Sequence, residues 1–292
     1  MTEVVELNQE LATLSRLLVL GALTIYVVSF LLLAWSLTQK VSAGKNDKAA
    51  NLVEKIGLGV MGLAVLVQFV GVLTRGIAAH RVPWANMYEF SITGSFIVTF
   101  IYLVATFFKD IKFIATFVSG FVVLIIGSAN TLFYVQVESL MPALQDYWLV
   151  IHVSVAILAT AFFMIAAALA AILIAKSGKS KSKLLKVFPT VEKLQKLSYQ
   201  FNIIGFILWS FTLIAGAIWA DKAWHRFWGW DTKEVWTFII WTIYAAYLHA
   251  TTTRGWEGKK AAWLTLIGFT AILFNFTIVN LFFKGLHVYS GL

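Results

Sequence analysis

The fold of this chain follows from one stretch, Trp224-His-Arg-Phe-Trp228-Gly-Trp230-Asp231-Thr-Lys-Glu234-Val-Trp236, which joins two long apolar runs. Six of the twelve tryptophans lie between residues 219 and 241. Tryptophan favours the membrane–water interface because its ring is apolar and its N–H needs a polar partner. Such a belt accounts for one or two tryptophans at a helix end. The denser group here predicts a membrane-edge loop whose surface suits a large planar apolar ligand with polar edges.

Composition places the whole chain in a membrane. Of the 292 residues, 60% are hydrophobic and 13% are charged, and the mean hydropathy is +0.83; a soluble domain is nearer half apolar and a quarter charged. A membrane helix needs about 20 apolar residues. Eight runs satisfy this requirement: 17–37, 56–74, 90–108, 113–134, 148–175, 201–219, 235–252 and 261–283. We therefore expect an all-α polytopic membrane protein with about eight transmembrane helices, forming a single integral membrane domain over residues 1–292.

Basic residues orient these helices, because cytoplasmic loops are enriched in Lys and Arg. With the amino terminus outside, sixteen of the 23 basic residues fall in inward loops, and the 134–147 loop has none. Both termini and the Trp-rich loop 219–241 are then expected on the non-cytoplasmic side. The basic segment 176–200 is expected to be a cytoplasmic loop on anionic lipid headgroups, and the spacing of Val191, Leu194, Leu197 and Tyr199 after Pro189 favours a short interfacial helix within it. The +9 charge thus indicates orientation and not nucleic-acid binding.

Two histidines are expected at the outer membrane face. His152 follows Trp148 by four residues, so both lie on one helix face, and His152 is only about 6 Å below the helix edge. His287 lies four residues past the eighth run. Imidazole suits iron, and a pair of histidines can ligate haem. The alternative is two ordinary interfacial histidines.

His249 is expected deeper, about 25 Å along the helix from Asp231. Phe238, Thr242 and Ala245 precede it on the same face. No second histidine lies at this depth, so a haem bound here would have one open axial position or a ligand from another subunit. A buried histidine hydrogen-bonded to a neighbouring helix is the alternative.

Other polar residues near these loops have structural interpretations. Asp231 and Glu234 form an Asp-x-x-Glu pattern before an apolar helix, which is typical of a capping box. His225 is expected to be an interfacial polar residue. His80 opens a loop in which Pro83, Asn86 and Glu89 suit a helix start, and a structural role is expected for it. Cysteine is absent, which excludes disulfides, thiolate metal sites and a cysteine nucleophile on this chain.

The run from Trp228 to His249 resembles the WWD signature of haem-handling proteins, and more narrowly the CcsA/ResC branch of the System II cytochrome c maturation machinery. The similarity extends to three further motifs: Pro83-Trp-Ala-Asn-Met-Tyr-Glu89, Tyr147-Trp-Leu-Val-Ile-His152-Val and Gly285-Leu-His287-Val-Tyr. Two positions depart from the family pattern, since Thr232 stands where proline is usual and His225 stands where a small residue is common.

The resemblance implies roles for individual residues. His152 and His287 match the two outer histidines that ligate haem iron in the family. His249 matches the transmembrane histidine for haem arriving from the cytoplasm, where the CcsB/ResB subunit supplies the other ligand. The remaining residues expected to contact haem are those of the Trp-rich loop: Trp224, Trp228, Gly229, Trp230, Asp231, Glu234 and Trp236.

The resemblance also implies an enzyme. The expected activity is transport of haem b across the membrane and its attachment to the Cys-x-x-Cys-His segment of apocytochrome c, as a haem lyase working with CcsB/ResB. A thioredoxin-like protein would keep the thiols reduced. The expected location is the bacterial cytoplasmic membrane, or the thylakoid membrane. Alternatives are a CcmC-type haem-delivery protein without ligase activity, a b-type membrane cytochrome, and a non-haem transporter.

Overall fold

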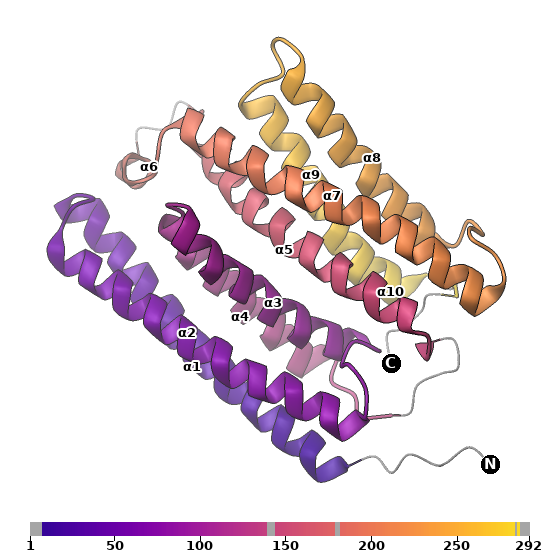
Figure 1. Cartoon of the computed structure of the whole chain (residues 1–292). Helices are drawn as coiled ribbons and strands as arrows, with labels where there is room; N and C mark the ends of the chain where they lie inside the picture. The colour runs from indigo at the N-terminus through magenta and orange to yellow at the C-terminus, as the bar shows by residue number, and fades with distance from the viewer. Residues whose placement is uncertain (1–7, 139–143, 179–181, 284, 287–292) are drawn as a thin grey trace. The chain divides into compact units, whose positions relative to one another are not determined.

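A computed structural model describes residues 8–138, 144–178, 182–283 and 285–286. The described residues form helices and connecting loops without a β-strand, which confirms the all-α class (Figure 1). The chain divides into two compact units, the first ending at Gln145 and the second beginning at Asp146. Within the described ranges, each unit is built around four long helices.

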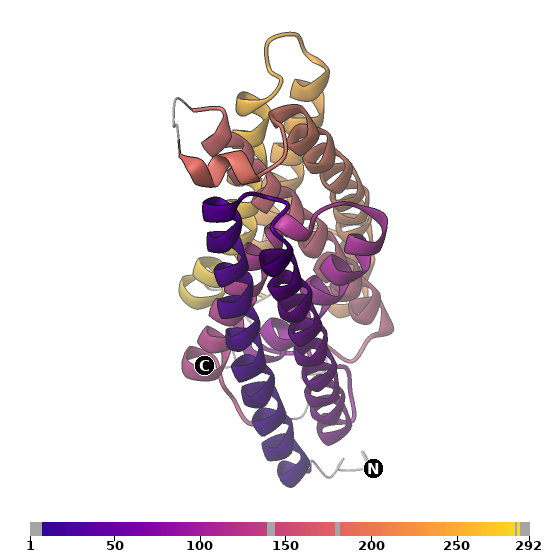
Figure 2. The same ribbon diagram turned by 90° about the vertical axis from the view of Figure 1, so that its left-hand side faces the viewer.

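The first unit contains α1 (Gln9–Ala43), α2 (Lys48–Ala79), α3 (Met87–Phe108), the short η1 (Lys112–Ile114) and α4 (Ala115–Leu132). Its four long helices close a ring, since α1 packs on α2, α2 on α3, α3 on α4 and α4 on α1. Figure 2 shows α1 and α2 running side by side. Serines allow this close approach: Ser15, Ser29 and Ser36 of α1 donate to backbone carbonyls of α2 at 2.6, 2.8 and 2.7 Å. Small hydroxyl residues at such contacts are typical of membrane helix pairs.

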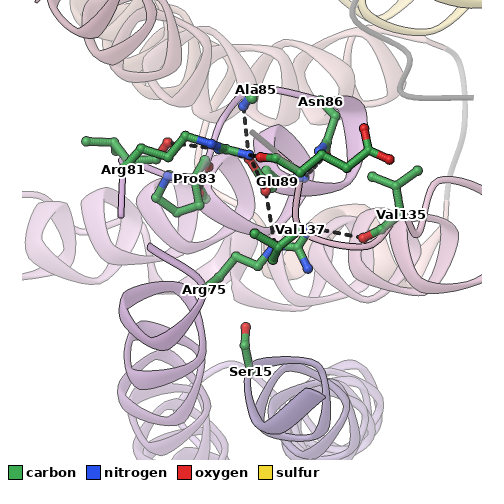
Figure 3. Close-up of polar contacts among 12 residues, drawn as sticks. Ser15, Arg75, Arg81, Pro83, Ala85, Asn86, Glu89, Val135 and Val137 are labelled. Carbon is green, nitrogen blue, oxygen red and sulfur yellow. Dashed lines mark hydrogen bonds and ion pairs between the residues drawn. The ribbon is translucent and has the colours of Figure 1, made fainter. Parts of the chain in front are cut away.

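A buried ion cluster holds one end of this unit together (Figure 3). The Glu89 carboxylate accepts from Arg75 at 3.0 Å and also pairs with Arg81, and Arg75 and Glu89 are fully buried. Arg75 also donates to the Val135 carbonyl, after α4, at 2.9 Å. Asn86 caps α3 by accepting from the Glu89 N–H at 2.9 Å, so the expected helix start is confirmed. The cluster therefore joins the end of α2, the start of α3 and the chain after α4.

The second unit contains α5 (Tyr147–Lys176), α6 (Lys183–Val187), α7 (Val191–Trp224), α8 (Thr232–Thr252), α9 (Lys259–Phe274), the π-helical turn η3 (Asn275–Val279) and α10 (Asn280–Phe282). Here α5 packs on α7 and α9, and α8 packs on α7 and α9. At the centre, the rings of Phe163 and Tyr244 stack with centroids 3.6 Å apart. The helix alternation places the end of α7, the start of α5 and α8, and the end of α9 at one end of this unit, which we call the tryptophan end.

Two predicted boundaries differ from the structure. The Trp-rich loop expected over residues 219–241 is a loop only at 225–231, because its first residues end α7 and its last residues begin α8. Residues 191–200, expected in the basic loop 176–200, are the first part of α7, which Thr190 caps by accepting from the Lys193 N–H at 3.3 Å. The loop region is further compacted by Lys176, whose Nζ donates to the carbonyls of Leu185 and Phe188 at 2.9 and 2.7 Å. The segment 176–200 is therefore only partly a loop.

Within the described residues, seven helices are long and apolar enough to cross a membrane. They are α1, α2, α3, the combined η1–α4, α5, α7 and the combined α9–α10. The eighth expected span, 235–252, is present as the 21-residue α8, whose several Trp, Tyr and Thr side chains lower its hydropathy. At 1.5 Å per residue, α8 is about 31 Å long, enough for the hydrocarbon core.

Candidate functional site

The Trp-rich loop is held in shape by its own polar groups. His225 ends α7 with φ +55°, and its N–H donates to the Asp221 carbonyl at 2.9 Å. The Glu234 carboxylate is buried and accepts from the N–H groups of Gly229 at 2.7 Å and Asp231 at 3.1 Å. Arg226 pairs with the other Glu234 oxygen at 3.3 Å. These contacts brace the turn between α7 and α8 before any ligand is present.

The two oxygens of the Asp231 carboxylate bond to different segments of the chain. One oxygen accepts from the Lys233 N–H at 3.0 Å, and with Glu234 it completes the capping box at the start of α8. The expected capping box is thus confirmed. The other oxygen accepts from the backbone N–H of Leu286 at 2.8 Å. Asp231 therefore links the Trp-rich loop to the chain that follows α10.

An aromatic surface continues from this loop down α8. We call it the aromatic platform, and it consists of three exposed residues, Trp228, Trp230 and Phe238, and the half-buried Trp241. Trp228 meets Trp230 and Phe238 edge-on at 5.8 and 6.3 Å, and Phe238 stacks on Trp241 at 5.9 Å. Trp230 is 77% exposed and has φ +59°, in the left-handed region that bulky residues rarely adopt. Such strained and exposed residues cluster at functional sites.

His152 lies in a notch of α7. Its Nδ1 is 3.0 Å from the carbonyl oxygen of Thr212, so in the neutral ring Nδ1 carries the proton and the lone pair is on Nε2. Its ring lies 6.0 Å from the buried Trp219 and nearly parallel to it. Gly216 makes the notch, because a Cβ there would lie 2.8 Å from Cε1 of His152. A backbone carbonyl that fixes the tautomer is a common support for a metal-ligating histidine.

The remaining tryptophans of the loop region are inside the unit. Trp236 packs against the helix core and lies 4.5 Å from Phe274. Trp224 meets Trp219 edge-on at 4.8 Å and lies 5.9 Å from the Arg226 guanidinium. The structure thus places Trp228 and Trp230 on the surface, Trp219 beside His152 with Trp224 against Trp219, and Trp236 against the core.

The other histidines are placed as follows. His249 is exposed near the far end of α8, and Phe238 and Thr242 are exposed on the same helix; the opposite side carries the buried Tyr244 and Tyr247. The ring of His249 makes no hydrogen bond within the described residues. This does not fit the alternative of a buried histidine hydrogen-bonded to a neighbouring helix. His80 ends α2 with φ +52°, which gives it the expected structural role. His287 lies outside the described residues.

Sequence reasoning missed two residues of this site, Thr212 and Gly216. A sequence signal exists for Gly216, since it lies three residues before Trp219 of the Trp-rich segment and so on the same helix face. Nothing in the sequence indicates that this face meets His152, because that contact joins helices 60 residues apart.

Comparisons with known proteins agree on one family. The model of the family described as "Cytochrome C assembly protein" matches residues 84–287. The cytochrome c biogenesis protein CcsA of one strain of Prochlorococcus marinus is 31% identical over 92% of this chain and 93% of its own. CcsA of Guillardia theta is 34% identical over 81% of this chain and 86% of its own, and CcsA of Chlamydomonas reinhardtii is 32% identical over 79% and 67%.

A solved structure has the same fold. Cytochrome c Heme Lyase CcmF superposes with a TM-score of 0.68 over 90% of this chain at 16% identity, and the match spans 46% of the CcmF chain. At this identity, the likeness shows the fold alone. The family match and the relatives' identities lead to one conclusion: the chain belongs to the CcsA family of cytochrome c biogenesis proteins, within the cytochrome c assembly family, and is an integral membrane protein.

Proposed function

We propose that this protein carries haem b across the membrane and attaches it to apocytochrome c, with His152 and His287 as the axial ligands of the iron at the tryptophan end. The observation that carries the proposal is the presence, in one unit, of an aromatic platform with three exposed rings and a histidine with a fixed tautomer. The platform offers a flat apolar surface for a porphyrin, and His152 offers an Nε2 lone pair for iron.

Trp230 supports the ligand-binding role of the platform. A left-handed conformation costs a non-glycine residue roughly 1–2 kcal/mol, and the 77% exposed ring recovers little of this by packing in the unit. A ring held outward at such a cost suits a ligand that stacks on it.

His249 supports a route for haem along α8. It is exposed on the same helix as Phe238 and Thr242, and a haem bound there would need a second axial ligand from outside the described residues. A CcsB/ResB subunit that presents a histidine at this depth would complete the site. An ionisable group facing outward from a membrane helix is a functional residue by default.

The protein's share of the reaction is positioning. With the iron held, each thiol of the Cys-x-x-Cys-His segment adds across a vinyl group: the sulfur bonds to one vinyl carbon and the thiol hydrogen ends on the other. The addition is neutral in electrons, so it needs reduced thiols, supplied with the help of a thioredoxin-like protein, but no further redox partner. Holding both reactants in place supplies much of the rate. This chain lacks cysteine and therefore presents no competing thiol.

The test is the visible spectrum of the purified protein. We expect a low-spin reduced haem signal that falls in His152→Ala. His80→Asn is the matched control, because His80 ends α2 in the other unit and asparagine tolerates its positive φ. Equal haem in both variants and the parent would reject the outer site.

A second measurement separates ligase from delivery activity. The protein is reconstituted with and without the CcsB/ResB subunit and given haem and a reduced Cys-x-x-Cys-His peptide. We expect covalent haem-peptide, detected by mass spectrometry, only with the partner. Haem binding without any covalent product in either case would favour the CcmC-type delivery role.

A further inference from the structure

We infer that Asp231 and Lys233 of the Trp-rich motif are positioning residues that hold the chain leading to His287, and that Asp231 acts on this chain rather than on the porphyrin edge. The inference rests on the proposed function for its chemical meaning. In this inference the role of the Asp231 carboxylate is not to contact haem. It holds the backbone at Leu286, just before His287, the proposed second axial ligand.

The first tie is the Asp231 carboxylate. Its Oδ2 accepts from the backbone N–H of Leu286 at 2.8 Å, and its Oδ1 accepts from the Lys233 N–H at 3.0 Å. Leu286 is 47% exposed, so packing of its side chain contributes little to holding this segment. Among the described residues, this bond is the one that holds the backbone at 285–286. His287 follows Leu286 directly in the sequence.

Gly285 makes the first tie possible. A Cβ at this position would lie 2.3 Å from Oδ2 of Asp231 and 3.2 Å from its Cγ. The carboxylate cannot yield easily, since Asp231 is fixed at the start of α8 by its capping bonds. The close approach of the carboxylate to the chain therefore requires glycine here.

The second tie is Lys233, two residues further along the same helix start. Its Nζ donates to the carbonyl of Asn275 at 3.0 Å. Asn275 begins the π-helical turn η3, through which α9 passes to α10. π-Helical turns are uncommon and are frequent at functional sites. Through Lys233 and Asp231, the first turn of α8 thus holds the chain after α9 at two points, residues 275 and 286.

The consequence is a shared anchor. The turn that presents Trp228 and Trp230 also holds the backbone at Leu286, so the platform and the chain just before His287 keep their separation when haem arrives or leaves. An iron ligand held to within a fraction of an ångström is what a preorganised site needs.

The decisive variants are Asp231→Ser and Gly285→Ala. Serine is a good helix cap, so Asp231→Ser keeps the start of α8 while its short side chain no longer reaches Leu286. Gly285→Ala places a Cβ against the Asp231 carboxylate, which disrupts the same hydrogen bond to Leu286 and leaves α8 unchanged. We expect both to convert low-spin haem to a mixture with a five-coordinate high-spin species, as His287→Ala would. Added imidazole should restore the low-spin spectrum in all three.

A contact between Asp231 and the haem edge makes a different prediction. Asp231→Ser would then lower haem content with the remaining haem still low-spin, Gly285→Ala would resemble the parent, and imidazole would restore nothing. That result would overturn the inference.

A readout without haem separates this inference from the proposed function. The chain has no cysteine, so Leu286→Cys carries a nitroxide label uniquely and keeps the backbone N–H at 286. We expect the label to become more mobile when Asp231→Ser is added, and a label at Glu257→Cys, in the α8–α9 loop, to be unchanged. Unchanged mobility at 286 would overturn the inference even in a protein that binds haem. Increased mobility in a protein that binds none would leave the tie standing and reject the proposed function.

Discussion

At the scale of single residues, a glycine positions the proposed iron ligand His152. The ring of His152 can reach the Thr212 carbonyl because Gly216 has no side chain at the crossing of α5 and α7. The hydrogen bond then decides which imidazole nitrogen carries the lone pair. Likewise, Trp230 is exposed because its backbone takes a left-handed turn that directs the ring away from the helix core.

Gly216→Ala is expected to lower haem content about as much as His152→Ala. The new Cβ would lie 2.8 Å from Cε1 of His152, so the ring must move, and overpacking of this kind costs about 1–3 kcal/mol. The measurement is the ratio of haem to protein after purification. Gly62→Ala is the matched control, because a Cβ at Gly62 meets nothing within 4 Å. Full haem in Gly216→Ala would mean that the position of His152 is unimportant.

Trp230→Gly is expected to separate stability from binding. Glycine relieves the left-handed strain of roughly 1–2 kcal/mol, so the thermal unfolding temperature should hold or rise. Loss of the ring should speed the transfer of haem to apomyoglobin, which is followed by absorbance. Trp236→Gly should lower the thermal unfolding temperature, because Trp236 packs against the core. Unaltered haem transfer in Trp230→Gly would remove this ring from the platform.

At the scale of helices, glycines also decide how closely neighbours pack. A Cβ at Gly268 of α9 would lie 2.7 Å from the Tyr244 ring of α8, and one at Gly205 of α7 would lie 2.7 Å from the Phe163 ring of α5. Because those two rings stack on each other, both helix pairs meet at a single aromatic contact in the middle of the second unit.

Gly268→Ala is therefore expected to destabilise the second unit by about 1–3 kcal/mol, as overpacking does. The measurement is thermal unfolding in detergent. A helix position with room for a Cβ gives the opposite sign, since alanine is favoured over glycine in a helix by about 1 kcal/mol. Gly127→Ala, where a Cβ meets nothing within 4 Å, supplies that control. Equal stability of the two variants would contradict the close packing at Tyr244.

The sequence predicted helix existence better than helix extent. The capping box at Asp231 and the cap at Asn86 were readable, because both depend on residues three apart. The first ten residues of α7 were readable only as a short interfacial helix and not as the start of the membrane span, because they are too polar for such a span. They are helical since Leu194 and Leu197 are buried and Ser198 donates to the Ala166 carbonyl of α5 at 3.2 Å. Contacts such as His152 with Gly216 depend on the register between helices, which sequence spacing within one helix cannot give.

At the scale of the whole molecule, α8 decides the topology. Among the described residues, seven other spans are apolar enough to cross by composition, and α8 joins two of them. If α8 crosses, the Trp-rich loop and the 253–258 loop lie on opposite sides of the membrane. Its length of about 31 Å suits a crossing, and its aromatic content suits a helix that faces a ligand or a partner as well as lipid.

Single cysteines test this arrangement directly, because the chain has none of its own. In sealed vesicles, Lys222→Cys and Glu257→Cys are expected to react with an impermeant maleimide from opposite sides, with Glu257→Cys on the cytoplasmic side. The basic loops place that side inside. Reaction of both from one side would mean that α8 does not cross, and would reduce the topology to seven spans.

The ion cluster of Figure 3 has a consequence for biosynthesis. The described groups that satisfy Arg75, Arg81 and Glu89, including the carbonyls of Val135 and Glu138, all precede residue 139 in the chain. Leaving one of these buried charges unpaired costs about 3–5 kcal/mol, so the first unit is expected to close with the pair formed. All the parts that this closure needs are on the nascent chain while the ribosome is still making the second unit.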